Sequence, residues 1–208
     1  CGIVVIAPME ALTTAQLLSK KYSRRDIISG GILGKQSKLC IAGAPKVGKS
    51  FLALQMSFEL ALGKPFLGTF KIEHPVTSYY LQMEISEVEF QRRVRLMSDS
   101  YPEAQFYTLS MRPIRLDTEK GQEFLTRELQ ETRAEVLVVD PLARVHGRDE
   151  NDMGEMSRLT GYFDYLIYSL GISVVIIHHT RKVGMEERMG THESGLKMQW
   201  MRGTSDLM

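Results

Sequence analysis

Residues 43–50 spell GAPKVGKS, in which two glycines enclose four residues and are followed by lysine and serine. This stretch fits the phosphate-binding loop G-x-x-x-x-G-K-[ST] at every defined position. A glycine-containing turn lets backbone N–H groups approach phosphate oxygens, and the helix that follows adds its positive N-terminal end. Lys49 is expected to reach the β- and γ-phosphates, and Ser50 to place its hydroxyl on Mg²⁺. The predicted nucleotide-binding residues are Gly43, Ala44, Pro45, Lys46, Val47, Gly48, Lys49, Ser50 and Phe51.

A second candidate is the carboxylate of Asp140, which ends the apolar run VLVVD and precedes a proline. Four apolar residues followed by aspartate form the Walker B pattern, in which the carboxylate holds the water shell of Mg²⁺ opposite Ser50. The alternative is a buried strand that ends in a helix-capping aspartate. The phosphate loop earlier in the chain favours the metal role.

Glu84 is the candidate for the group that orients the attacking water, a role that nucleotide hydrolysis requires. It follows the run YYLQM and would lie beside the phosphate loop if the two strands run parallel. The alternative is a helix N-terminal glutamate, because Ser86 and Glu87 come next.

His178 and His179 end the strand-like run SVVIIHH. Adjacent residues of a strand point to opposite faces, so the two imidazoles cannot bind one metal from one face. One should face the nucleotide side, where a polar group could hydrogen-bond the γ-phosphate and report its loss. We assign this sensor role to His179, and the alternative is a pair of hydrogen-bonded structural histidines.

The elements that must position these side chains alternate along the chain. Amphipathic helical patterns, with apolar residues at spacings of three and four, separate most of the short β-rich runs. Near-continuous apolar strands alternating with helices predict a mainly parallel sheet covered on both faces, which is an α/β fold of three layers. The β-rich runs are 39–43, 77–83, 105–110, 136–140 and 173–178.

Composition excludes several classes of protein. The 208 residues are 43% hydrophobic and carry a net charge of +1, so disordered and collagen-like chains are excluded and one domain with a full core is expected. Near-neutral charge restricts any nucleic-acid site to a local patch. Two cysteines form neither a disulfide framework nor a zinc site, which favours a reducing, cytoplasmic setting. No apolar run approaches membrane-spanning length. The chain lacks a starting methionine and is expected to be a trimmed form of a longer one.

The order GAPKVGKS, LQMEIS, VVDPLARVHGRDENDMGEMSRLTGYFDYLIYSLGISVVIIHHTRK and MRGTS resembles that of the RecA-like P-loop ATPases. Within them the chain looks most like the plasmid RepA-type replicative helicases, which are related to the DnaB-type helicases. The resemblance covers about residues 27–206 and implies a lead segment, 1–26, followed by a RecA-like ATPase domain, 27–208. It implies ATP and Mg²⁺ as cofactors and catalytic roles for Lys49, Glu84, Asp140 and His179.

The resemblance also implies a homo-oligomer, a hexameric ring with active sites between subunits. A basic residue of the neighbour then completes each site as an arginine finger, for which Arg202 in MRGTS is the candidate. Two irregular stretches, 143–154 and 182–199, correspond to loops that line the central channel and contact single-stranded DNA. Their cations are Arg144, Arg148, Lys182, Arg188 and Lys197, with His146 in the first stretch. The alternative is ordinary solvated loop charge, which the acidic neighbours favour.

The sequence therefore predicts a Mg²⁺-dependent ATPase motor, a ring-forming replicative DNA helicase that moves along single-stranded DNA. Two alternatives stay open. One is a RecA-like ATPase that mediates recombination or repair. The other is a regulatory switch that binds ATP without appreciable turnover.

Overall fold

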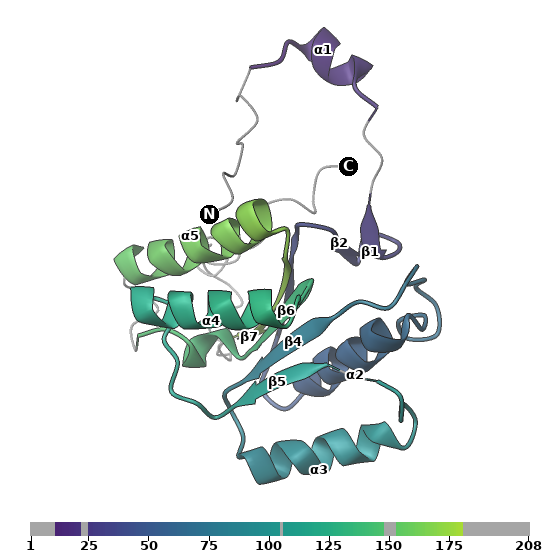
Figure 1. Ribbon diagram of the computed structural model, residues 1–208, viewed down its shortest axis with the longest axis vertical. Helices are drawn as coiled ribbons and strands as arrows, with labels where there is room; N and C mark the ends of the chain where they lie inside the picture. Colours follow the sequence, from purple (N-terminus) through teal and green to yellow (C-terminus); the bar gives the residue numbers. More distant parts are fainter. Residues whose placement is uncertain (1–10, 22–24, 105, 148–152, 181–208) are drawn as a thin grey trace, which may run out of the picture.

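The computed structural model describes residues 11–21, 25–104, 106–147 and 153–180. Its centre is a five-stranded parallel sheet in the order β3-β7-β6-β4-β5 (Figure 1). The strands are β3 (Lys38–Gly43), β4 (Ser78–Gln82), β5 (Tyr107–Ser110), β6 (Val136–Asp140) and β7 (Ser173–His179). Each of the five β-rich runs in the sequence thus becomes a strand, and the expectation of a parallel sheet is confirmed.

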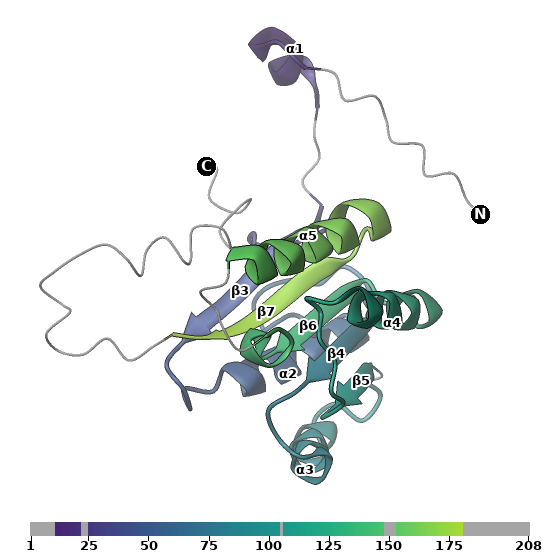
Figure 2. The ribbon, with the colours of Figure 1, turned by 90° about the vertical axis from the view of Figure 1, so that its left-hand side faces the viewer.

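Helices connect consecutive strands and cover both faces of the sheet. They are α2 (Lys49–Leu62), α3 (Glu87–Ser98), α4 (Glu119–Glu131) and α5 (Met153–Leu170), with a short 3₁₀ turn η1 (Leu142–Arg144) after β6. Figures 1 and 2 show α2 and α3 on one face and α4 and α5 on the other. The three-layer architecture predicted from the alternation is therefore present.

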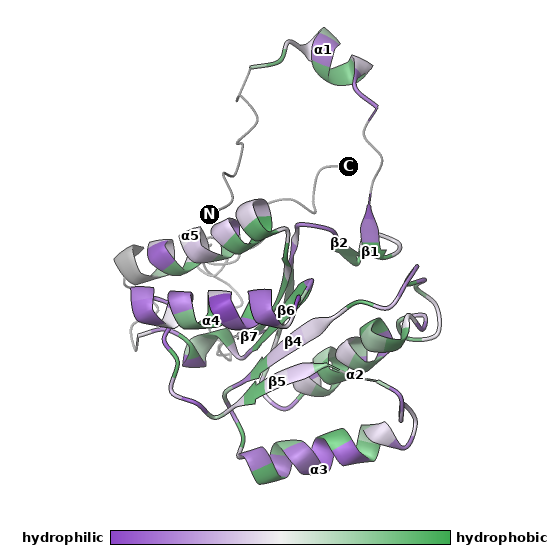
Figure 3. Ribbon diagram, in the orientation of Figure 1, coloured by the Kyte–Doolittle hydropathy of each residue, from purple (hydrophilic) through white to green (hydrophobic). Residues whose placement is uncertain are grey.

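Two hydrophobic clusters hold the layers together. One contains Leu125 of α4 and Phe163 of α5, packed on Leu137 of β6. The other contains Phe58 of α2 and Phe90 of α3, packed on the opposite face of the sheet. Figure 3 shows the corresponding pattern, with α2 largely hydrophobic and α4 hydrophobic on one side only. The central strands β4 and β6 are buried along their whole length, as expected for parallel strands covered on both faces.

Local sequence signals set the starts of the helices next to the site. Ser86 caps α3 by accepting a hydrogen bond from the Glu89 amide at 3.3 Å, which is the usual role of a serine at this position. Thr118 caps α4 in the same way. Glu84 thus lies before the cap of α3 and is not part of its first turn.

Two further elements precede the sheet. The antiparallel pair β1 (Asp26–Ile28) and β2 (Leu33–Gly34) adds Ile28 and Leu33 to the cluster beneath α2. A six-residue helix, α1 (Thr14–Ser19), has a capping box at Thr13 and buries no residue. Among the described helices, none has the length and apolar character needed to cross a membrane.

Candidate functional site

The phosphate-binding loop joins β3 to α2 and is exposed from Ala44 to Gly48. Gly48 adopts φ 92°, a left-handed conformation that favours glycine, and no side chain caps the helix start there. The first amides of α2 are therefore left without a side-chain acceptor, and they carry the positive end of the helix dipole. This arrangement suits a phosphate group.

Lys49 is buried within this loop, with only 6% of its surface exposed. Its Nζ donates hydrogen bonds to the carbonyl oxygens of Gly43, at 2.9 Å, and Ala44, at 2.7 Å. These two bonds satisfy part of the ammonium group and fix the positive charge inside the loop. The lysine thus braces the loop backbone in the structure as described.

Ser50 and Asp140 meet although they lie 90 positions apart in the chain, and the serine Oγ donates to Asp140 Oδ1 at 3.1 Å. Asp140 Oδ2 accepts a second hydrogen bond from the Tyr80 hydroxyl at 2.6 Å. Burial raises the pKa of the Asp140 carboxyl above its ordinary value, and the hydrogen bonds from Tyr80 and Ser50 oppose that rise. A divalent cation would favour the ionised carboxylate, and hydroxyl and carboxylate oxygens are ligands that Mg²⁺ accepts.

The backbone at Glu84, just after the end of β4, is held by the side chain of Gln82. The buried side chain of Gln82 accepts hydrogen bonds from the amides of Glu84, at 2.7 Å, and Ile85, at 3.1 Å. Its Nε2 also donates to the carbonyl oxygen of Ile85 at 2.6 Å. Gln82 therefore fixes the turn from which the Glu84 carboxylate projects.

His179 faces Glu84 across the strand ends, with Nε2 3.7 Å from Glu84 Oε1. Its place follows from the sheet, because His179 is the register partner of Gly43 and the amide of Thr180 donates to the Gly43 carbonyl at 3.1 Å. Strand β7 thus brings the histidine between the phosphate-binding loop and Asp140. Within the described part of the chain, neither ring nitrogen of His179 has a hydrogen-bond partner.

Glu84 comes close to the end of the phosphate-binding loop, although their strands are not neighbours in the sheet. The strands run parallel, but β7 and β6 stand between β3 and β4. Glu84 lines a small hollow of about 10 Å³ together with Asp140 and with Ser50, the last residue of that loop. The parallel strand ends share one edge of the sheet, so these groups converge without their strands being neighbours.

Three other residues belong to this site and were not anticipated. Tyr80, Gln82 and Arg93 also line the hollow. Tyr80 and Gln82 are two residues apart in β4, a spacing that places them on one face of the strand; Glu84 follows two residues later, beyond the end of β4. Burial raises the pKa of the Tyr80 hydroxyl, the negative charge of Asp140 raises it further, and Arg93 acts in the opposite direction.

The residues predicted to contact DNA or the neighbouring subunit lie mostly outside the described part of the chain. Arg148, Lys182, Arg188, Lys197 and Arg202 lie outside the described residues. Arg144 is exposed at the end of η1, whereas His146 is 8% exposed and is packed inside the protein. His146 therefore does not offer a surface cation, because the segment after η1 turns it inward.

A model of a protein family described as an AAA domain matches residues 6–185 of the chain, which is most of its length. The chain belongs to the AAA-domain family. A sequence comparison with curated proteins finds no match. Among solved structures, the KaiC-like protein from the hyperthermophilic archaeon Pyrococcus horikoshii OT3 superposes with a TM-score of 0.54 and 14% sequence identity. The match covers 77% of this chain and 72% of that one, and at this identity it establishes the RecA-like fold alone.

This AAA-domain protein thus has the RecA-like P-loop ATPase fold, and ATP with Mg²⁺ is the general cofactor pair of such ATPases. The residues present fit that pair, since the uncapped start of α2 suits phosphate and the Ser50–Asp140 oxygens suit a hard cation. The described residues contain no cluster of three or more His, Cys, Asp or Glu able to hold a metal ion. A cation here would depend on Ser50, Asp140, water and the phosphates.

Proposed function

We propose that this AAA-domain protein is a Mg²⁺-dependent ATP hydrolase. The observation that carries this proposal is the convergence, at one edge of the sheet, of a phosphate-binding loop, the Ser50–Asp140 oxygen pair and the Glu84 carboxylate. The loop alone would support nucleotide binding. The carboxylate facing the same hollow adds the group that hydrolysis requires.

Each residue has a role that follows from its position. The amides at the start of α2 and the charge of Lys49 bind the phosphates, and Ser50 and Asp140 hold the cation, which supplies positive charge that stabilises a departing phosphate. Glu84 orients the attacking water and accepts its proton. His179, next to both Glu84 and the phosphate-binding loop, relates the state of the site to the segment that follows β7.

We infer further that hydrolysis drives movement along single-stranded DNA within a homo-oligomeric, hexameric ring. Two features of the described residues support this. The segment after Asp140 leads directly to the exposed Arg144, and β7 ends at His179, three positions before the second basic stretch begins. Both predicted DNA-contacting stretches therefore follow closely in the chain on residues of the site, so a change there could move them. The assignment of an arginine finger to Arg202 belongs to the same proposal.

The first test is steady-state ATP hydrolysis with Mg²⁺. Lys49→Ala should abolish phosphate binding and turnover, whereas Lys35→Ala, which alters an exposed lysine outside the loop, should leave both unchanged. Glu84→Gln should retain nucleotide binding and lose turnover by about 10²-fold or more. Equal hydrolysis by the parent and Lys49→Ala would refute the ATPase proposal. Tight ATP binding with negligible turnover in the parent would favour the regulatory switch.

The second test addresses DNA. A ring motor predicts that single-stranded DNA stimulates hydrolysis and that light scattering gives a mass close to six subunits. Filaments of variable length would favour the recombination or repair ATPase. A strict monomer whose hydrolysis ignores DNA would exclude the ring motor and leave the ATPase proposal intact.

A further inference from the structure

Arg93 stands out among the residues around the site because one nitrogen of its guanidinium is left without a hydrogen bond to any described residue. Its Nε is buried and has no hydrogen-bond partner in the described part of the chain. The nearest carboxylate oxygen, Glu89 Oε1, lies 3.7 Å from that nitrogen, beyond hydrogen-bond distance. A guanidinium carries five N–H donors, and a buried donor without an acceptor is costly.

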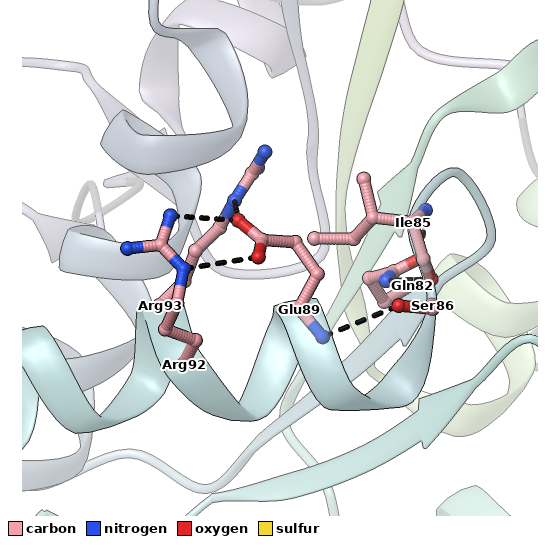
Figure 4. A network of polar contacts seen from close by, with 6 residues as sticks. All are labelled: Gln82, Ile85, Ser86, Glu89, Arg92 and Arg93. Atoms are coloured by element: carbon pink, nitrogen blue, oxygen red, sulfur yellow. Dashed lines mark hydrogen bonds and ion pairs between the residues drawn. The ribbon is translucent and has the colours of Figure 1, made fainter.

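The neighbouring Arg92 shares the Glu89 carboxylate with Arg93 and makes the shorter contacts to it. Arg92 donates to both carboxylate oxygens of Glu89, through Nε at 2.9 Å and through its terminal nitrogen at 2.8 Å (Figure 4). Glu89 is thereby engaged in a bidentate pair, which is the preferred geometry of arginine with a carboxylate. Arg93 keeps a longer ion pair with the same carboxylate, and its Nε has room for a closer acceptor.

The position of Arg93 directs that capacity toward the nucleotide site. Its guanidinium carbon lies 4.9 Å from the centre of the Phe51 ring. Phe51 directly follows Ser50 in the chain. The side chain lines the same hollow as Ser50, Glu84 and Asp140. Phe90, one turn earlier on α3, packs its ring 5.5 Å from that of Tyr80 and so fixes α3 against the site.

The Glu84 carboxylate is the acceptor in this hollow that lacks a firm partner. Asp140 is already bound by Ser50 and Tyr80. Among the described residues, the one ion pair of the Glu84 side chain is the 3.7 Å contact with His179, and the side chain is 43% exposed. Within this part of the chain, a guanidinium whose Nε has no hydrogen-bond partner and a carboxylate held by one long contact therefore line the same small hollow.

We propose that Arg93 is a positioning residue for Glu84, which it draws into the hollow beside Ser50 and Asp140 through an ion pair. This inference rests on the proposed ATPase function, because it assigns the placement of the catalytic carboxylate. Arg93 acts in the same chain as Glu84, and His179 is the competing partner of that carboxylate. Binding of the nucleotide does not depend on Arg93, whereas the chemical step does.

The test separates turnover from binding in the 208-residue chain. Arg93→Ala should lower kcat by about 10- to 100-fold, the range expected for losing a charge-assisted contact and misplacing a reacting group. The Kd for a fluorescent Mg²⁺–ATP analogue should change less than about 3-fold. Arg93→Lys should restore part of kcat, because lysine keeps the charge without the planar fork. Arg95→Ala is the matched control, since Arg95 is exposed on the same helix.

The remaining outcomes overturn the inference in distinct ways. A Kd raised in step with the loss of turnover would show that Arg93 contacts the nucleotide itself. An unchanged kcat in Arg93→Ala would show that it contributes nothing. An equal loss in Arg93→Lys and Arg93→Ala, with lowered thermal stability of both, would show a structural role. Failure of the ATPase proposal is recognised separately, because the parent would then show no hydrolysis sensitive to Lys49→Ala.

Discussion

Replacement of Gln82 by leucine tests how the catalytic turn is held. The Gln82 side chain is 2% exposed and makes three hydrogen bonds with the backbone of Glu84 and Ile85, at 2.6 to 3.1 Å. Leucine has a similar volume and no polar atom. Gln82→Leu therefore removes the three bonds while filling the same space, so cavity formation contributes little.

The expected loss of stability follows from these bonds. Each neutral hydrogen bond contributes about 0.5–1.5 kcal/mol net. Glu84 is exposed and Ile85 half-buried, so water can replace some of the lost partners. We expect the free energy of unfolding to fall by about 2–3 kcal/mol and the melting temperature by about 4–12 °C. Because Glu84 is no longer fixed, kcat should fall by about 10-fold or more.

Urea unfolding and steady-state hydrolysis measure the two effects on the same protein. Gln91→Leu is the matched control, since Gln91 is exposed on α3, and its free energy of unfolding should stay within about 0.5 kcal/mol of the parent. A Gln82→Leu protein with unchanged stability would refute the hydrogen-bond argument. A destabilised protein with unchanged kcat would refute the claim that Gln82 positions Glu84.

Two further predictions concern buried carboxyls. Because burial raises the pKa of Asp140 from 3.8, its stabilising contribution is present below that value and is lost as pH rises through the folded-state pKa. Asp140→Asn should therefore gain stability relative to the parent as pH rises from 3 to 7 without Mg²⁺–ATP, because only the parent carries a buried carboxyl that ionises, and it should lose hydrolysis; urea unfolding at both pH values measures the difference, and a difference that does not grow with pH would contradict it. Glu59 is buried and accepts hydrogen bonds from Gln55, Leu67 and Tyr101. Glu59→Leu should therefore lower the free energy of unfolding by about 3 kcal/mol. Nucleotide affinity should stay unchanged, because Glu59 lies about 15 Å along α2 from Lys49. Thermal melting and analogue binding would show this, and a weakened affinity would contradict it.

Much of the fold could be predicted from the sequence because its signals are local. Parallel strands buried on both faces require continuous apolar runs, and each such run became a strand. The helix caps at Ser86 and Thr118 are visible as residue types ahead of amphipathic segments. The short helix α1 was missed although Thr13 and Gln16 form a capping box, because the segment has no apolar stripe to reveal it.

The site was predictable where chemistry and chain position coincide. GAPKVGKS identifies itself, and Asp140, Glu84 and His179 are polar residues at the ends of apolar strands. Their partners were harder to find. Tyr80 looks like an ordinary strand aromatic, and its bond to Asp140 joins residues 60 positions apart. Arg93 looks like one of several arginines on an exposed helix face.

The sequence by itself determined which residues bear the chemistry and that a parallel α/β layer would carry them, since residue types and periodicity are properties of short segments. The tertiary structure alone decided which of these residues meet. Chain order does not contain the strand order β3-β7-β6-β4-β5. That order places His179 against Glu84 and sets two strands between β4 and β3, the strand that leads into the phosphate-binding loop. Contacts between distant segments depend on how the whole core packs. That the Nε of Arg93 lacks a hydrogen-bond partner among the described residues is therefore recognised only once α3 lies against the sheet.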